Sequence, residues 1–324
     1  RDGMTFVRTV HGDIDPSELG PTYAHEHLAI AGGRPRELFP DFVPGDVDEV
    51  VEELGEPMLL GLRAVVDGMP ADAGRDVLVL AEIASRTGLH VVAPTGLHHA
   101  RYYDDRHWSL RLVPDELADL FEADIEIGID ALDYGGPVVR RTPHRAGVIK
   151  VAGSEDGPSL RDARIFAAAA LAQRRTGCPI LTHCEHGTGA VEQLELLRDH
   201  GADLSHVILS HTDKRVDREY HREVLASGAF VEYDQAFRWP EGEPNGTLQL
   251  LEWLEEDGLG SRIVLGMDAA RRGYWRVYGG RPGMGFLLGA FRDAMRLRGL
   301  AEASIDGYFV ANPARAFAFG EPRG

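Results

Sequence analysis

Short apolar runs rich in β-branched residues alternate along the chain with longer segments in which apolar residues recur at helical spacing. Eight runs have the length and composition of buried strands: 22–28, 63–68, 90–96, 147–153, 179–184, 206–211, 229–234 and 262–268. Amphipathic segments lie between most of them, and several end in glycine, as helix C-termini often do: 72–88, 160–177, 189–201 and 246–258.

This succession of strand–helix units predicts an α/β fold, a (β/α)8 TIM barrel that forms a single domain over residues 1–324. An open doubly wound sheet is the structural alternative. Such sheets usually have fewer strands, and their nucleotide-binding forms carry a G-x-G-x-x-G turn that is absent after the first strand here. The stretch 99–146 is the least regular and predicts one helix over 114–128 with loops on the catalytic face.

Polar residues stand at or near the ends of several predicted strands, where catalytic groups of such barrels lie. They are His25, His27, Lys150, His183, His211 and Asp268. Taken singly, each has an ordinary explanation: a hydrogen-bonded core histidine, a salt-bridged lysine or an aspartate cap. An unpaired polar group costs roughly 2–7 kcal/mol to bury, so the whole set favours a common functional site. The H-x-H pair also delivers two imidazoles to one face of a strand, as a metal site requires.

These residues and the segments around them resemble the phosphotriesterase family of the amidohydrolase superfamily along essentially the whole chain. The matching segments are "GDIDPSELGPTYAHEHL", "VIKVAGS", "ILTHCEHG", "LSHTDK", "GMDAARRGYW" and "ANPARAF". The resemblance implies two divalent metal ions, often zinc, although manganese, cobalt and iron accept the same ligands. By this resemblance His25, His27 and Asp268 hold one ion, and His183 and His211 hold the other. Lys150, carboxylated by carbon dioxide, would bridge both ions together with a hydroxide.

The chemistry of this set is that of a hydrolase. A lysine carbamate is a bidentate anion, which an ammonium group is not, and two metal ions lower the pKa of a shared water. Asp268 is then placed to accept the proton of the hydroxide and pass it to the leaving group. We therefore expect a metal-dependent enzyme that hydrolyses ester bonds, with Asp268 and Lys150 as catalytic residues. Retention of every ligand argues against a non-catalytic relative, and Lys150 argues against a mononuclear deaminase.

The segment after the eighth strand bears on the substrate. Arg271 and Tyr274 follow Asp268, and a guanidinium with a phenol is a suitable phosphate clamp. The segment resembles the branch that opens phosphorylated sugar lactones, where a basic residue after strand seven also contributes; Arg238 is the candidate here. We expect a lactonase for a (phosphorylated) sugar lactone that uses a metal-bridging hydroxide. The alternatives are a phosphotriesterase or an acyl-homoserine lactonase with the same metals. In these alternatives the arginines of this region are solvated loop residues that pair with acidic neighbours.

The composition of the chain limits the classes of partner that it is expected to bind. The formal net charge of -18 disfavours nucleic acid and anionic membranes, so an anionic small-molecule substrate would need a local basic pocket. No apolar run reaches about 18 residues. Two cysteines, Cys178 and Cys184, make no disulfide framework. These features predict a soluble cytoplasmic protein, and the family resemblance suggests a homodimer.

Two smaller features remain open at this point. His98 and His99 could line the substrate pocket with Tyr102 and Tyr103, or could lie in a surface loop. Glu26 lies between the two histidines of the H-x-H pair. On a regular strand it points to the opposite face, where it could pair with a basic group of the outer layer.

Overall fold

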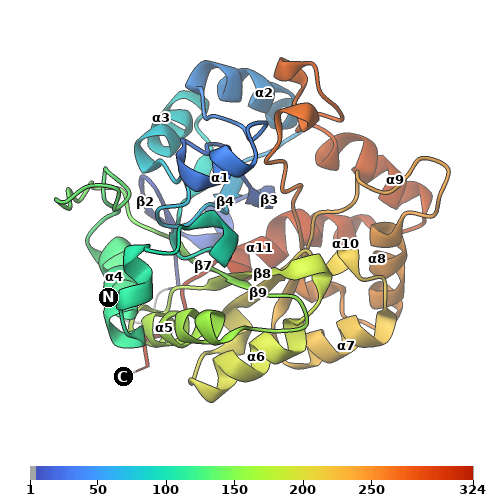
Figure 1. Ribbon diagram of the computed structural model, residues 1–324. Helices are drawn as coiled ribbons and strands as arrows, with labels where there is room; N and C mark the ends of the chain where they lie inside the picture. The colour runs from blue at the N-terminus through green and yellow to red at the C-terminus, as the bar shows by residue number, and fades with distance from the viewer. Residues whose placement is uncertain (1–4, 324) are drawn as a thin grey trace.

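Parallel strands form the centre of the fold and helices surround them (Figure 1). The computed structural model describes residues 5–323. The strands are β3 (Thr22–Glu26), β4 (Ala64–Asp67), β5 (His90–Val92), β6 (Pro94–Gly96), β7 (Val148–Gly153), β8 (Ile180–Cys184), β9 (Val207–Ser210), β10 (Phe230–Tyr233) and β11 (Ile263–Leu265). Each lies within one of the strands predicted from the sequence.

Hydrogen bonding divides the strands into two sheets, β3-β4-β5 and β6-β7-β8-β9-β10-β11. β5 and β6 are two halves of the predicted third strand, interrupted at Ala93. At the other junction the backbone N–H of Asp268 donates to the carbonyl of His25 at 2.9 Å, which joins the end of β11 to β3. The strands thus occupy eight positions around a ring, and the predicted (β/α)8 barrel is confirmed.

Helices follow the strands as the amphipathic pattern predicted. They are α1 (Gly33–Leu38), α2 (Val47–Leu59), α3 (Val77–Thr87), α4 (Pro114–Glu126), α5 (Leu160–Thr176), α6 (Ala190–Asp199), α7 (Arg218–Ala226), α8 (Gly246–Glu256), α9 (Arg292–Leu297), α10 (Glu302–Asp306) and α11 (Asn312–Ala316). Asp76 caps the start of α3, and Gly88 ends it at a φ of 75°, which a glycine adopts without strain.

The barrel interior changes character along its axis. Its lower part is filled by small and branched apolar side chains such as Val66, Val148, Leu181 and Val264. Two residues further along each of these four strands, the interior positions carry Gly68, Lys150, His183 and Gly266. Because side chains alternate along a strand, the apolar pattern that builds the core also aims these later residues at the mouth of the barrel.

Two parts of the fold were not predicted. An antiparallel hairpin, β1 (Val7–Thr9) with β2 (Gly12–Ile14), precedes the barrel. The second part lies in the irregular stretch 99–146. That stretch contains the expected helix α4, but the sequence did not show that Arg75 anchors the segment after α4. Its guanidinium is buried between Asp124, at 2.9 Å, and Asp133, at 2.7 Å. Although burial opposes ionisation, these two carboxylates raise the pKa of Arg75, so the guanidinium stays charged.

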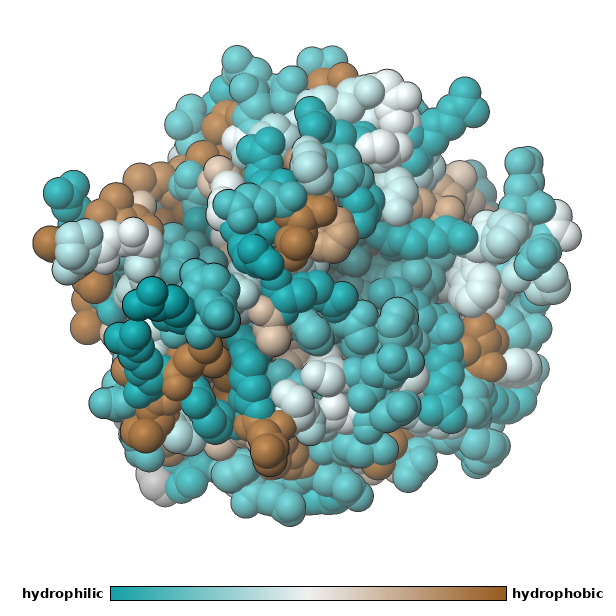
Figure 2. All heavy atoms as spheres, viewed as in Figure 1, coloured by the Kyte–Doolittle hydropathy of each residue, from teal (hydrophilic) through white to brown (hydrophobic). Residues whose placement is uncertain are grey.

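The outer surface is mostly hydrophilic on the face shown in Figure 2, and its apolar residues form small separate patches. Among the described residues, no helix combines the length and the apolar character needed to cross a bilayer.

Candidate metal centre

The six predicted metal ligands meet at one end of the barrel. His25, His27, His183, His211 and Asp268 line a cavity of about 210 Å³. Lys150 is fully buried next to them, and its Nζ is 3.0 Å from Nε2 of His25. The residues come from five different strands, so the barrel brings together side chains that are up to 243 positions apart in the chain.

His25, His27 and Asp268 form the first grouping. Oδ1 of Asp268 lies 3.0 Å from Nε2 of His27 and 3.8 Å from Nε2 of His25. Ligand atoms on one tetrahedral zinc ion, each at about 2.0–2.1 Å, are separated by roughly 3.3 Å. The observed separations bracket that value, and all three atoms face the same space. This donor set therefore fits one divalent ion.

His183 and His211 form the second grouping, with ring centroids 4.6 Å apart. Each already uses one nitrogen. Nε2 of His183 is 2.9 Å from the carboxylate of Glu185, which Arg101 also contacts, and Nδ1 of His211 is 2.5 Å from Asp234. Nδ1 of His183 and Nε2 of His211 remain as the atoms that could bind an ion. A carboxylate on the distal nitrogen is the usual arrangement around metal-binding histidines.

Lys150 is suited to carry a carbamate. Burial lowers the pKa of its amine to about 8, so about a tenth of it is neutral at pH 7 and about half at pH 8. Burial and the nearby Lys150 also lower the pKa of His25, which keeps its imidazole neutral and able to act as a ligand. Gly68 leaves the space for this contact, since a Cβ at that position would lie 2.5 Å from Nε2 of His25.

Glu26 holds the backbone around Asp268. Its buried carboxylate accepts hydrogen bonds from the N–H groups of Met267, at 2.7 Å, and Ala269, at 3.2 Å. Asp268 itself has a φ of 47°, a conformation that side-chain-bearing residues rarely adopt. The expectation that Glu26 pairs with an outer basic group is wrong. A shift in the β3–β4 register between Tyr23 and Glu26 re-aims the side chains of this strand.

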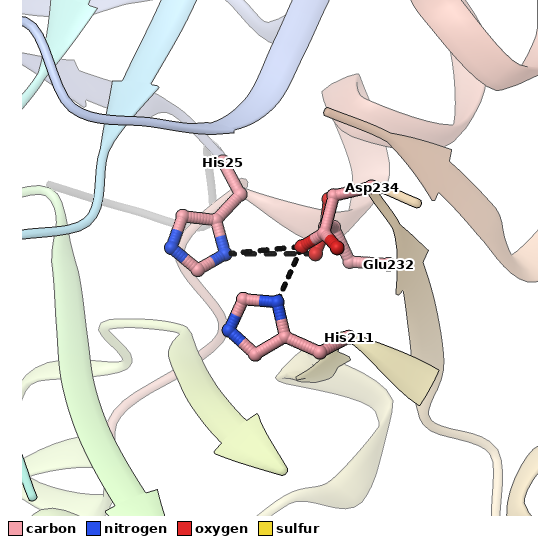
Figure 3. Close-up of side chains that lie close together, drawn as sticks. All are labelled: His25, His211, Glu232 and Asp234. Atoms are coloured by element: carbon pink, nitrogen blue, oxygen red, sulfur yellow. Dashed lines mark hydrogen bonds and ion pairs between the residues drawn. The ribbon is translucent and has the colours of Figure 1, made fainter. Parts of the chain in front are cut away.

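Two acidic residues, one on β10 and one directly after it, lie beside His25 and His211 (Figure 3). Glu232 and Asp234 are both fully buried and approach His25 and His211. Burial and the neighbouring Asp234 raise the pKa of Glu232 well above its usual range. Burial would also raise the pKa of Asp234, but His211 lowers it below its usual range. At 2.5 Å, the contact between His211 and Asp234 is a hydrogen bond with no room for an ion between the two atoms.

The predicted substrate residues Arg238, Arg271 and Tyr274 all line the cavity. Arg238 is largely engaged: it donates to the carbonyls of Asp234, Met267 and Asp268, at the ends of two strands. Arg271 contacts both oxygens of Asp41 through Nη1, at 2.7 Å each. Their role in binding substrate stays a prediction, and Arg238 has a structural role besides.

The loop after β6 contributes two of the four residues that were left open. His98 and Tyr102 line the cavity, with their rings 4.4 Å apart, and His98 packs 5.4 Å from His183. His99 and Tyr103 do not line it. The hydroxyl of Tyr103 instead accepts from the N–H of His98 and donates to the carbonyl of Ala71, which fixes the loop.

Sequence reasoning missed the carboxylates that contact the histidines. Glu232 and Asp234 occupy alternate positions in "VEYD". Two acids on one face of an otherwise apolar strand were the sequence signal that could have identified them. Glu185 directly follows the fifth predicted strand in "THCEHG", where it cannot be told apart from a surface residue.

A search against protein-family models matches the phosphotriesterase family over residues 5–317. The chain belongs to this family. Its similar proteins include a lactonase and an aryldialkylphosphatase, which hydrolyse ester bonds, and the predicted family and enzyme class are confirmed.

Individual members of the phosphotriesterase family are similar over the full chain. A phospho-furanose lactonase of Mycoplasmopsis synoviae is 34% identical, over 98% of this chain and 93% of that protein. A crystal structure of an amidohydrolase from Mycoplasma synoviae superposes with a TM-score of 0.93 at 32% identity, covering 99% of this chain and 94% of that one. A lactonase from Listeria monocytogenes gives a TM-score of 0.89 at 28% identity, covering 98% and 100%.

Proposed function

We propose that this protein is a binuclear metal-dependent lactonase that opens a phosphorylated sugar lactone. The observation that carries the proposal is the lining of the cavity, which holds both the metal-ligand residues and Arg271, Arg238 and Tyr274. A substrate with a lactone carbonyl and a distal phosphate matches both groups of residues. The phospho-furanose lactonase among the relatives supports the same substrate class.

Two divalent ions would be held by the six residues described above, with Lys150 as a carboxylated ligand shared between them. Imidazole and carboxylate donors suit zinc, and also manganese, cobalt or iron. When bound, such ions supply Lewis acidity that activates water and polarises an ester carbonyl.

Asp268 is the residue placed to move the proton. Burial would raise the pKa of its carboxyl, but the hydrogen bond to His27 and the neighbouring histidines hold that pKa well below its usual range. Asp268 is thus ionised before reaction, and its side chain keeps 23% of its surface exposed to the cavity. It can accept a proton from the attacking water and deliver it to the ring oxygen that leaves as the lactone opens.

The size of the cavity favours a compact substrate. About 210 Å³ is below the roughly 300–1,000 Å³ of pockets for larger ligands. A monosaccharide lactone is better matched to this space than the long acyl chain of an acyl-homoserine lactone. Ile30, Phe42 and Met69 add an apolar wall, and this wall supports weak activity on neutral phosphotriesters as the second candidate function.

A comparison of kcat/KM tests the proposal. Zinc-reconstituted protein would be assayed with a phosphorylated sugar-1,4-lactone, an acyl-homoserine lactone and an aryl phosphotriester. Two charge-assisted contacts at about 1.5–3 kcal/mol each predict a preference of roughly 100-fold or more for the phosphorylated lactone. A preference for either of the other substrates would overturn the assigned substrate class while leaving the metal centre in place.

A further inference from the structure

Glu232 is a buried acid that none of the steps above uses. It has no exposed surface, and neither of its carboxylate oxygens has a hydrogen-bond partner among residues 5–323. Nδ1 of His25 is also buried and without a hydrogen bond within the same part of the chain. These two unsatisfied groups face each other, with Nδ1 of His25 3.5 Å from Oε2 of Glu232 (Figure 3).

We propose that Glu232 is a positioning residue for the metal centre: it accepts a hydrogen bond from Nδ1–H of His25 and so keeps the lone pair of Nε2 directed at the metal. The inference rests on the metal centre of the proposed function and adds a residue to it.

The two nitrogens of His25 face different surroundings. Nε2 lies 3.0 Å from Lys150 and 3.8 Å from Asp268, on the side of the cavity. Nδ1 lies on the far side, 3.5 Å from Glu232 and 4.0 Å from Asp234. A neutral imidazole carries one N–H and one lone pair, so an acceptor at Nδ1 selects the tautomer that can ligate through Nε2.

Asp234 does not take this role because it is already engaged. Its carboxylate is hydrogen-bonded to His211 at 2.5 Å and also contacts Gln235. Glu232 on β10 and Asp234, directly after this strand, are two residues apart and therefore share a face. One strand thus presents one carboxylate to a ligand of each ion, Glu232 to His25 and Asp234 to His211.

The space for Glu232 is built into the neighbouring strand. A Cβ at Gly266, just after β11, would lie 2.7 Å from Oε1 of Glu232 and 2.8 Å from the backbone nitrogen of His25. Any side chain at position 266 would push the carboxylate and the histidine apart. The absence of a side chain there allows β3, β10 and β11 to bring the two groups together.

Zinc binding by the metal-free protein tests the proposal, with a competing chelator to resolve the two affinities. Glu232→Met removes the acceptor at similar volume, and we expect one of the two ions to bind roughly 10–100-fold more weakly. Glu232→Gln keeps an acceptor oxygen and is expected to stay within a few-fold of the wild type. Glu232→Ala should repeat the loss seen with methionine and replaces that variant if methionine does not fit.

Melting of the metal-free proteins separates positioning from general stability. Replacing this buried acid by an apolar group of similar size removes a desolvation cost that offsets the lost contact with His25, so the melting temperature should not fall. Glu53→Met is the matched control: Glu53 is also buried, but it accepts from the N–H groups of Val277 and Met284. That variant should melt at lower temperature and bind zinc with unchanged affinity.

The outcomes are distinct. Two ions bound by the Glu232→Met variant with wild-type affinity would overturn the role of Glu232 alone. Equal weakening of both ions, together with a lower melting temperature, would also overturn it in favour of a structural role. Failure of the wild-type protein to bind two ions would instead refute the proposed function on which the inference rests.

Discussion

Replacement of Arg271 by methionine should weaken binding of a phosphorylated lactone far more than that of an uncharged one. Arg271 lines the cavity and uses only Nη1 to contact Asp41. Its Nε and Nη2 have no hydrogen-bond partner among the described residues, so this edge of the guanidinium is available to a phosphate. Arginine binds phosphate through two parallel hydrogen bonds from such an edge.

The magnitude follows from what the guanidinium gains and gives up. A hydrogen bond to a charged group contributes about 1.5–3 kcal/mol, which corresponds to roughly 10–150-fold in KM. The pair with Asp41 is solvent-exposed on both sides, at 38% and 51%, and such pairs are worth at most about 1 kcal/mol. Competition from Asp41 is therefore too weak to cancel the phosphate contact, and Asp41→Asn should improve KM by no more than about fivefold.

Steady-state kinetics on a phosphorylated lactone and its unphosphorylated counterpart measure this difference. Arg272→Met is the matched control, because Arg272 is the adjacent arginine but donates to the carbonyl of Pro40 and does not line the cavity. We expect Arg271→Met to raise KM for the phosphorylated substrate only, and Arg272→Met to change neither substrate. An equal loss on both substrates in Arg271→Met would refute the phosphate clamp and indicate that Arg271 only supports the loop.

Three further predictions concern the centre and its scaffold. Asp268→Asn should lower kcat by roughly 10²–10⁴-fold, since the amide cannot accept the proton, and a loss below tenfold in steady-state assays would contradict this role. In metal-free protein, carbamate formation at Lys150 should increase as pH rises through about 8, because its amine loses its proton there. ¹³C NMR with labelled bicarbonate measures the carbamate yield, and a yield independent of pH would contradict this prediction. Arg75→Met should lower the free energy of unfolding by about 3–5 kcal/mol, because Asp124 and Asp133 stay buried without their cation. Denaturant titration measures this free energy, and a change below about 1 kcal/mol would disprove the anchoring role of Arg75.

The barrel and its six candidate ligands were predictable because one rule governs both. Apolar residues at alternate positions define the strands, and polar residues that break the pattern at the strand ends fall at the mouth of the barrel. His183 continues the inward face of Leu181, and Lys150 that of Val148. Periodicity therefore located these side chains without any knowledge of their contacts.

Contacts between strands were beyond this reasoning. The change in register at β3, which turns Glu26 toward the backbone of Met267 and Ala269, depends on how β3 pairs with β4. The sequence shows no partner for Arg238, yet in the fold three carbonyl groups accept hydrogen bonds from its guanidinium. The partnership of Glu232 with His25 requires Gly266 of a third strand. Sequence patterns place a residue on a face but do not show what the neighbouring strand presents to it.

Zinc titration of the metal-free protein, with lactonase activity measured at each step, tests the central claim most directly. Six residues on five strands converge here on two groups of donors, so we expect activity to be absent without metal and to reach its plateau at two ions per chain. Full activity in metal-free protein, or a plateau at a single ion, would contradict a binuclear lactonase.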